Sequence, residues 1–360
     1  MLHAMVMAGG GGTRFWPRSR AVRPKQFLAM GGERTLLQLA FDRLEACALP
    51  VSRCWIVTGA AYVAETQRQL PTLDESHIVG EPTGRDTAPC VALGAALIAR
   101  TDPDATILVT PADHLIEPTR EFGRAVNVAA QIADEHPGAL LTFGIPPTYA
   151  SVGYGYIHRG ERLDIRQGIG VFRVQKFEEK PPRERAEQFF GSGEYFWNAG
   201  IFVWKARTIL EAIRTHRPTM HAAVERIADA WDTPRRAEVL AAEYPTMDKI
   251  SIDFAVMEKH PEVLTVQAPY QWDDVGSWLA LERILPQDAE GNTVQGNHVG
   301  LKTRNCVIVG EADKLVTTIG VQDLLIVQDG ECLLVAHRSD EATVKNLVDE
   351  LRKRGKEKHL

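Results

Sequence analysis

The chain has 360 residues, a formal net charge of -6, and 44% hydrophobic and 24% charged residues, a composition typical of a globular protein. Its five cysteines are scattered, odd in number and without a C-x-x-C pair, which argues against a disulfide framework and a zinc site. It shows neither the apolar core of a signal peptide nor a run of membrane-spanning length, and its balance is acidic, so we expect a soluble cytoplasmic protein that binds no membrane and no nucleic acid.

The first predicted element is a short apolar strand at residues 5–8, which leads into four consecutive glycines at 9–12. The first thirty-two residues contain five cations and no anion: Arg14, Arg18, Arg20, Arg23 and Lys25. Glycines allow the backbone N–H groups to approach a ligand closely, and fixed cations neutralise an anion. The pattern therefore favours a polyphosphate-binding loop over a flexible turn.

The amino-acid sequence of this loop excludes two better-known glycine motifs. A P-loop ends in Gly-Lys-Ser/Thr, which occurs nowhere in the sequence. The dinucleotide-binding fingerprint needs a third glycine where this chain has Arg14 or Phe15. Neither an ATPase of that class nor a dehydrogenase is favoured.

Strand-like and helix-like segments alternate through the first half of the chain. Further short buried strands are predicted at 54–58, 107–110 and 139–143, and apolar residues recur at helical spacing over 36–44 and 91–98. The alternation predicts an α/β fold with a largely parallel sheet, helices on both of its faces, and ligand-binding groups at the carboxyl ends of the strands.

The second half continues this pattern and then changes in composition. The segments predicted there are strands at 171–177 and 200–204 and helices at 208–214, 220–230 and 252–259. After Pro286 the chain becomes rich in valine, glycine and asparagine, with short strands that suit a β-helix or a sandwich, and it closes with a helical pattern over 342–351. We therefore predict a catalytic domain at 1–286 and a small β-rich domain at 287–360.

The glycine-rich loop carries a family resemblance. It resembles the G-x-G-T-R…P-K signature of the sugar-nucleotide pyrophosphorylases, and its fuller form, AGGGGTRFWPRSR…PKQF, resembles the mannose-1-phosphate guanylyltransferase branch. The resemblance extends over about residues 4–350. It implies a Rossmann-like nucleotidyltransferase fold with a mostly parallel mixed sheet flanked by helices, and a β-helix-like C-terminal domain.

The resemblance also implies a reaction and its partners. The enzyme would transfer GMP from GTP to mannose 1-phosphate, forming GDP-mannose and pyrophosphate, with Mg²⁺ as cofactor and no organic cofactor. We further expect a homodimer formed through the C-terminal domain. Two alternatives remain open: a guanylyltransferase for another hexose or heptose 1-phosphate, and a non-catalytic regulatory protein that binds sugar nucleotides.

Two aspartates are the candidate metal ligands. Asp113 follows the predicted strand at 107–110, and a second carboxylate lies in the loop WDDVGSW; either residue taken alone could be a cap or turn residue. Two carboxylates that converge on phosphate oxygens are a typical Mg²⁺ site. The resembled W-x-D-x-G pattern matches at Trp272, Asp274 and Gly276, so it implies Asp274 rather than Asp273, with Asp113 as the other ligand.

A second glycine-bearing turn, at residues 80–87, precedes a predicted helix whose N-terminal amides are available to anionic or carbonyl groups. The residues alone fit a capped helix start equally well, whereas the resemblance implies guanine recognition. The residues that it implies for the whole nucleotide are Ala8, Gly9, Gly10, Gly12, Thr13, Arg14, Glu81, Arg85, Asp86, Thr87 and Asp113.

The sugar phosphate is assigned to other elements of the resemblance. In the E-K-P element, Lys180 would meet the phosphate and Glu178 the sugar hydroxyls, Asn198 of the N-A-G-I element would meet a hydroxyl, and the loop at Gly153 would lie against the sugar. The segment ISIDF at 250–254 also matches the guanylyltransferase branch, although a structural role in a helix would explain it equally well.

The charge of the reactants sets the rest of the expectation. A phosphate monoester has its second pKa near 6, so the attacking oxygen is already anionic at neutral pH and needs no general base. The site must instead suppress the repulsion between two anions. The residues expected to be catalytic are Arg14, Lys25, Asp113, Lys180 and Asp274, and this complete set counts against a non-catalytic protein.

Overall fold

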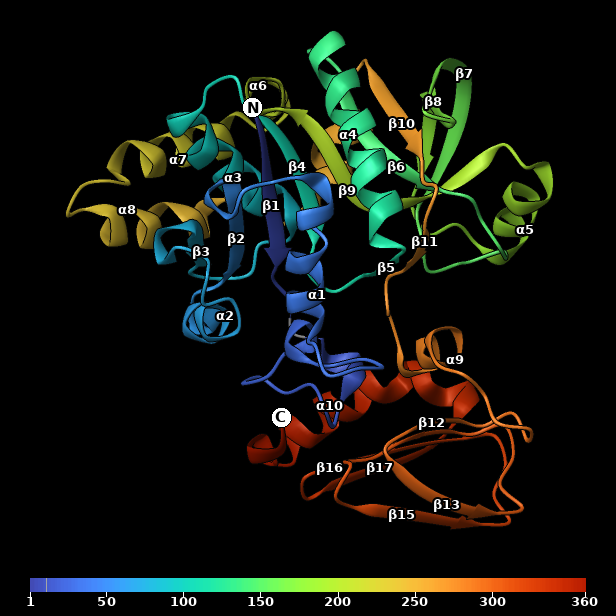
Figure 1. The fold of residues 1–360 in the computed structure, drawn as a ribbon. Helices are drawn as coiled ribbons and strands as arrows, with labels where there is room; N and C mark the ends of the chain where they lie inside the picture. The colour runs from blue at the N-terminus through green and yellow to red at the C-terminus, as the bar shows by residue number, and fades with distance from the viewer. Residues whose placement is uncertain (11) are drawn as a thin grey trace. The chain divides into compact units, whose positions relative to one another are not determined.

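The structure is a computed structural model that describes residues 1–10 and 12–360, so Gly11 of the glycine run lies outside the described residues. The chain forms two compact units (Figure 1). The first contains Met1–Gly9, Ala40–Ala112 and Ile116–Trp272, and the second contains Gly10–Leu39, Asp113–Leu115 and Asp273–Leu360. The second unit therefore includes Gly10, Gly12 and the cationic segment that follows them, which a division by sequence order alone does not anticipate.

The first unit is built on a nine-stranded sheet with the order β3-β2-β1-β4-β9-β6-β10-β8-β7. Strands β8 and β9 run opposite to the other seven. The expected mostly parallel mixed sheet is confirmed. The strands are β1 Leu2–Ala8, β2 Cys54–Gly59, β3 Ile78–Glu81, β4 Thr106–Pro111, β6 Leu140–Ile145, β7 Tyr156–Arg166, β8 Ile169–Glu178, β9 Tyr195–Lys205 and β10 Val263–Gln267.

Helices cover the sheet because its central strands are apolar on both faces. Met5 and Ile107 belong to a core that includes residues of α3, α6 and α7, while Ala4 and Leu108, which alternate with them along the strands, are also fully buried. The helices of this unit are α2 Val63–Gln69, α3 Thr87–Thr101, α4 Thr119–Glu135, α5 Arg183–Ser192, α6 Ala206–His216, α7 Pro218–Ala230 and α8 Arg236–Glu243.

One expected helix has an unusual geometry. The segment predicted to be helical over 252–259 forms a π-helix at Asp253–Met257. Hydrophobic spacing cannot distinguish this form from an α-helix over so short a segment, and π-helical turns occur frequently at functional sites. No helix of the described residues is both long and apolar enough to cross a membrane.

The second unit combines the N-terminal loop with the C-terminal strands. Its sheets are a four-stranded one, β12-β14-β16-β17, and a parallel pair, β13 with β15. The short parallel pairings give the β-helix-like form that was expected, which is confirmed. The strands are β12 Thr293–Gln295, β13 Asn297–Leu301, β14 Val307–Val309, β15 Leu315–Ile319, β16 Leu324–Asp329 and β17 Cys332–His337, with helices α9 Leu281–Ile284 and α10 Val344–Lys353.

The core of the second unit contains side chains from both ends of the chain. Phe15 and Trp16 of the N-terminal loop are buried in one cluster with Trp278, Val307 and Leu325. Helix α1, Leu36–Asp42, begins at the end of this N-terminal segment, and β5, Leu115–Glu117, pairs with β11, Gln271–Asp273, in a separate small sheet. Phe15 and Trp16, which follow the glycine run, are thus anchored by packing against residues more than 260 positions further along the chain.

Candidate active site

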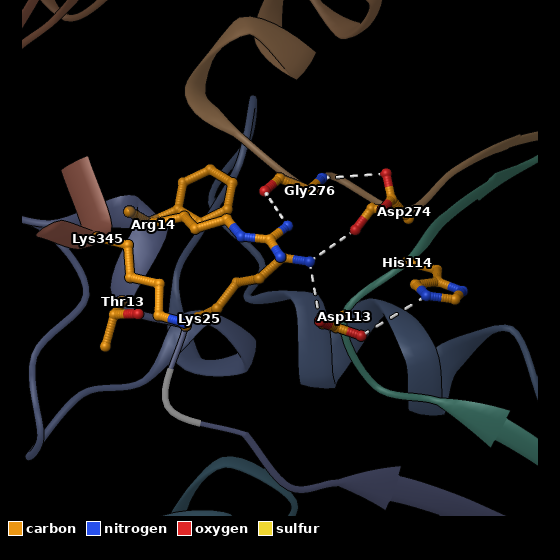
Figure 2. A pocket seen from close by; sticks show the side chains of 10 residues that line it. Thr13, Arg14, Lys25, Asp113, His114, Asp274, Gly276 and Lys345 are labelled. Carbon is orange, nitrogen blue, oxygen red and sulfur yellow. Dashed lines mark hydrogen bonds and ion pairs between the residues drawn. The ribbon is translucent and has the colours of Figure 1, made fainter. Parts of the chain in front are cut away.

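The second unit contains a charged pocket of about 320 Å³ (Figure 2). The residues that line it are Gly12, Thr13, Arg14, Phe15, Lys25, Asp113, His114, Asp274, Gly276 and Lys345. Four of the five predicted catalytic residues, Arg14, Lys25, Asp113 and Asp274, are therefore brought together. The fifth, Lys180, belongs to the first unit.

Lys25 is the central cation of this pocket. It is only 7% exposed and lies in a 3₁₀ turn, Lys25–Phe27, that begins directly after Pro24. Its Nζ atom donates to Oδ2 of Asp113 at 2.8 Å and to the backbone carbonyl of Asp274 at 2.6 Å, as Figure 2 shows. One ammonium group thereby holds two aspartates that lie far apart in the sequence.

Asp113 follows strand β4 and is half-buried. Burial acts to raise the pKa of its carboxyl group, but the charges of Lys25 and His114 outweigh that effect and hold the pKa below its usual value. The Nε2 atom of His114 lies 3.8 Å from Oδ1 of Asp113. The carboxyl group of Asp113 is therefore ionised at neutral pH.

Asp274 and its neighbour Asp273 have different surroundings. Oδ1 of Asp274 accepts from the backbone N–H of Gly276 at 3.1 Å, and a Cβ atom on Gly276 would lie 2.8 Å from Oδ2 of Asp274. Asp273 instead accepts from the N–H of Val275 at 2.7 Å and pairs with Nε of Arg283 at 2.5 Å. Asp274, and not Asp273, lines the pocket.

Three of the five N-terminal cations have protein partners outside the pocket. Arg18 donates to the carbonyl of Gly310 at 2.8 Å, Arg23 donates to both carboxylate oxygens of Asp329 at 2.8 Å, and Arg20 donates to the carbonyl of Asp329 at 3.2 Å. The cation excess that suggested polyphosphate binding is thus partly structural. Arg14 and Lys25 are the two members of the group that line the pocket.

Lys345, His114 and Phe15 also line the pocket, and sequence reasoning missed all three. Lys345 lies in α10, close to the end of the chain. A helix rich in basic residues is usually predicted to be a solvent-exposed surface helix. No local signal distinguishes it from the neighbouring lysines. His114 directly follows Asp113, so its position was visible in the sequence, but a histidine beside an aspartate has no specific meaning alone.

Glu81 lies at the carboxyl end of β3 in the first unit and is 6% exposed. Burial raises its pKa to about 7, although the hydroxyl of Tyr244 donates a hydrogen bond to its Oε1 atom. A Cβ atom on Gly9 would lie 3.2 Å from Oε2 of Glu81. The carboxyl group therefore lies close to the backbone where the glycine run begins, beside Ala8, whose carbonyl accepts from Thr58 at 2.9 Å.

The turn that precedes α3 has structural partners. Asp86, with φ of 66°, caps the helix by accepting from the N–H of Thr87 at 2.8 Å, and Oγ1 of Thr87 accepts from the N–H of Ile252, also at 2.8 Å. Arg85 donates to the carbonyl of Pro245 at 2.5 Å. The capped helix start that the sequence left open is therefore present, and nucleotide binding by these residues stays a prediction.

The predicted sugar-binding residues meet in the first unit. The backbone N–H of Asn198 donates to Gly155 at 2.8 Å, and that of Lys180 donates to Tyr154 at 3.3 Å, so both contact the loop that starts at Gly153. Lys180 has a φ of 45°, an uncommon value for a residue with a side chain. These backbone contacts bring the predicted phosphate-binding and hydroxyl-binding elements to one place.

Glu178 is bound by two basic side chains. Its Oε2 atom accepts from Arg185 at 2.7 Å and from Lys176 at 3.3 Å. The neighbouring Glu179 lies instead against Gly155, and Asn198 donates to Asp253 at 2.7 Å. Sequence reasoning assigned a role to neither of these two acids, although the segment ISIDF had been noted.

Comparison with known proteins gives two matching family models. The model described as nucleotidyl transferase matches residues 3–291, and the model described as MannoseP isomerase/GMP-like beta-helix domain matches residues 296–351. Together they span most of the chain.

Individual relatives agree with the family models. A mannose-1-phosphate guanylyltransferase of Escherichia coli K12 is 40% identical, over 99% of this chain and 75% of its own length. A mannose-1-phosphate guanylyltransferase of Salmonella typhimurium is 39% identical, also over 99% of this chain and 75% of its own length. A solved Thermus thermophilus structure, described as a mannose-1-phosphate geranyltransferase, has 35% identity and a TM-score of 0.86, with 98% of this chain and 99% of that chain covered.

Proposed function

The chain belongs to the nucleotidyl transferase family, and we propose that it transfers GMP from GTP to mannose 1-phosphate, forming GDP-mannose and pyrophosphate. The observation that carries this proposal is the single pocket in which Arg14, Lys25, Asp113 and Asp274 meet. Two cations and two carboxylates in one pocket suit a triphosphate with its metal ion. The identity of the relatives over nearly the whole chain supports the choice of guanylyl donor and mannose acceptor.

The relatives' descriptions name two different transferred groups, guanylyl and geranyl, and the charge of the pocket favours the guanylyl group. A geranyl chain is apolar and would need an apolar lining, because burying charged groups against it without compensation costs free energy. The lining here is charged or polar at most positions, including Lys345 and His114. We therefore infer a guanylyl rather than a geranyl donor.

The residues of the pocket fit Mg²⁺ as the cofactor. This ion usually keeps several waters and takes one or two protein carboxylates together with substrate phosphates. Asp113 and Asp274 provide that number of carboxylates in one pocket, and Asp113 is ionised at neutral pH. When bound, the ion would supply positive charge to the phosphate oxygens.

The protein's own residues supply the remaining charge. The attacking phosphate oxygen is anionic at neutral pH, so repulsion between the two substrates is the main barrier that the site must lower. We infer that Arg14 binds the outer phosphates of GTP, that Lys180 orients the sugar phosphate, and that Lys25 holds Asp113 and Asp274 in place. In this role Lys25 acts through its hydrogen bonds to the carboxylate of Asp113 and to the main-chain carbonyl of Asp274.

The expected homodimer has a surface that supports it. Strands β13 and β15 pair in parallel and expose the apolar side chains Val299, Leu301, Leu315 and Ile319, at 57%, 62%, 58% and 74% exposure. An exposed apolar face of this kind on a protein surface marks an interaction site. We propose that the same face of a second copy covers it, since two-fold self-association is the commonest closed assembly.

A pyrophosphate-release assay tests the proposed reaction. GTP, ATP, UTP and dTTP are each combined with mannose, glucose and fucose 1-phosphate, with Mg²⁺ and with a chelator. We expect the GTP and mannose 1-phosphate pair to react fastest and to stop when the metal is chelated. A faster reaction with another sugar would favour the alternative acceptor, and no release from any pair would indicate a non-catalytic protein.

A further inference from the structure

Asn198 is oriented by several groups of the protein. Its Oδ1 atom lies 3.0 Å from Oγ1 of Thr142 and 3.3 Å from the backbone N of Gly200, while its Nδ2 atom donates to Oδ1 of Asp253 at 2.7 Å. Such a network locks the amide in one orientation. The amide that the family resemblance assigns to a sugar hydroxyl is therefore used, at least in part, to hold a carboxylate.

Asp253 combines an unusual backbone with unused hydrogen-bonding capacity. It is the first residue of the π-helix Asp253–Met257, a form that occurs frequently at functional sites. An ionised carboxylate can accept about four hydrogen bonds. Within residues 1–10 and 12–360, Asn198 is the one side chain that donates to it. Burial raises the pKa of Asp253 to about 6, and the Asn198 hydrogen bond offsets only part of that effect.

Glu179 is a second acid in the same group. Its Oε2 atom occupies the space where a side chain at Gly155 would begin, and that space also adjoins Asn198, whose Cβ atom would lie 3.6 Å away. The negative charge of Glu179 contributes to the raised pKa of Asp253, so the two carboxylates are electrostatic neighbours. Gly155 is thus required to be small because an acid covers it.

Glu179 also connects this group to the predicted phosphate-binding lysine. The Nζ atom of Lys180 lies 3.1 Å from Oε1 of Glu179. A sugar 1-phosphate has a dianionic end and a ring of hydroxyl donors. Lys180 is a cation paired with one carboxylate, Glu179, whose charge also acts on a second, Asp253. This arrangement matches that order of charges, since carboxylates accept strong hydrogen bonds from hydroxyl groups. Glu178 is less suited to the role because Arg185 and Lys176 bind its carboxylate.

We propose that Asp253, positioned by Asn198, accepts a hydrogen bond from a hydroxyl group of the sugar 1-phosphate and thereby selects the sugar, with Glu179 as the second acceptor. The proposal rests on the proposed function and names residues of its acceptor site. A site built around a hydroxyl rejects analogues that lack it by several orders of magnitude, because its buried acceptor is left unpaired.

The test begins with the wild-type protein and a substrate series. Pyrophosphate release is measured with GTP and mannose 1-phosphate and with its 2-, 3-, 4- and 6-deoxy analogues. We expect one analogue to lose about 100-fold or more in kcat/KM. Equal use of all the analogues would overturn the proposal without any variant. Failure of wild type with every sugar 1-phosphate would instead overturn the proposed function.

The variant Asp253→Asn then identifies the acceptor. Its kcat/KM for mannose 1-phosphate should fall about as far as the kcat/KM of wild type falls when the critical deoxy analogue replaces mannose 1-phosphate. With that analogue as substrate, the variant and wild type should have similar kcat/KM values. The KM for GTP should stay unchanged. Glu238→Gln, at an exposed position of α8, is the control and should stay within about two-fold of wild type. Independent, additive losses for Asp253→Asn and the deoxy analogue would contradict the assignment.

A second variant keeps the proposal testable if Asp253→Asn does not fold. Glu179→Gln retains the shape of the side chain above Gly155 and removes its charge. It should raise the KM for mannose 1-phosphate by about ten-fold and change its ranking of the deoxy analogues, with no effect on the KM for GTP. An unchanged ranking in a folded Glu179→Gln variant would remove Glu179 from the site.

Discussion

The Nζ atom of Lys25 lies 2.8 Å from a carboxylate oxygen of Asp113. Lys25 is buried, and its second hydrogen bond goes to the main chain of Asp274. The lysine that ends the family's glycine-rich signature is therefore used to connect that loop to both candidate metal ligands. This gives Lys25 a structural function besides its charge.

Lys25→Met should damage both stability and turnover. The methionine keeps the apolar stem but leaves the Asp113 carboxylate without its partner, so we expect the free energy of unfolding to fall by about 1–3 kcal/mol and kcat by about 100-fold. Chemical denaturation and steady-state kinetics measure the two effects. Lys353→Met, in an exposed part of α10, is the control. A loss of GTP affinity with unchanged stability would mean that Lys25 acts on the phosphates alone.

Asp274→Asn should lower turnover by about 100- to 1,000-fold and leave the protein folded, because it removes one preorganised charge from the pocket. The adjacent Asp273→Asn is a matched control, since Asp273 binds Arg283 and the N–H of Val275 instead. We expect that control to lose stability rather than turnover. Kinetics at saturating Mg²⁺ and thermal unfolding separate the two, and near-normal turnover of Asp274→Asn would reject Asp274 as a ligand.

Arg14→Ala and Arg18→Ala should have opposite consequences. Arg14 is exposed, lines the pocket and donates a long hydrogen bond of 3.3 Å to the carbonyl of Gly276, so its loss should raise the KM for GTP by about ten-fold or more at unchanged stability. Arg18 donates to Gly310, so its loss should cost about 1–2 kcal/mol of stability at near-normal KM. Unchanged GTP kinetics in Arg14→Ala would exclude this residue from the nucleotide site.

Glu81 predicts a pH dependence of stability. Its pKa is about 7 in the folded protein against an ordinary value of 4.5, so the folded state binds the proton more strongly than the unfolded state. Stability should therefore fall as the pH rises from about 4.5 to about 7, by roughly 3 kcal/mol in total. Glu81→Gln keeps the size of the side chain and cannot ionise, so this slope should disappear.

The measurement is chemical denaturation of wild type and Glu81→Gln at pH 5, 6, 7 and 8. Glu238→Gln, at an exposed position of α8, should retain the wild-type slope. Parallel curves for wild type and Glu81→Gln would show that Glu81 does not titrate in this range.

Ile319→Glu should prevent the proposed homodimer. It places a charge in the exposed apolar face of β13 and β15, where a second copy would bury it without a partner. Light scattering after gel filtration should give twice the chain mass of 39.9 kDa for wild type and the single mass for the variant. Val22→Glu, at an equally exposed position outside this face, should remain dimeric. A monomeric wild type would contradict the dimer.

The sequence predicted those parts of the fold whose apolar pattern is local. The runs at 54–58 and 107–110 lie within β2 and β4, and the helical spacing over 91–98 lies within α3. Strand β7, Tyr156–Arg166, was not predicted. Its residues from Arg159 onward are mostly polar, and they are partly buried or exposed. A strand at the edge of a sheet lacks the continuous apolar pattern that marks a central one.

The candidate site divides in the same way. Asp113 and Asp274 were identified because each lies in a short, distinctive motif. Asp253 and Glu179 were not, because their significance depends on contacts with Asn198 and Gly155 that no spacing in the sequence reveals. The partners of Arg18 and Arg23 were hidden for the same reason: they lie about 300 positions away along the chain.

The burial of Trp16 with Trp278 and Val307, and the pairing of Arg23 with Asp329, have a consequence for protein engineering. A chimera that exchanges the β-rich segment between two relatives would also exchange the support of the glycine-rich loop. Residues 10–39 must therefore be transplanted together with the C-terminal strands, as one cassette, for the hybrid to keep its phosphate-binding loop in shape.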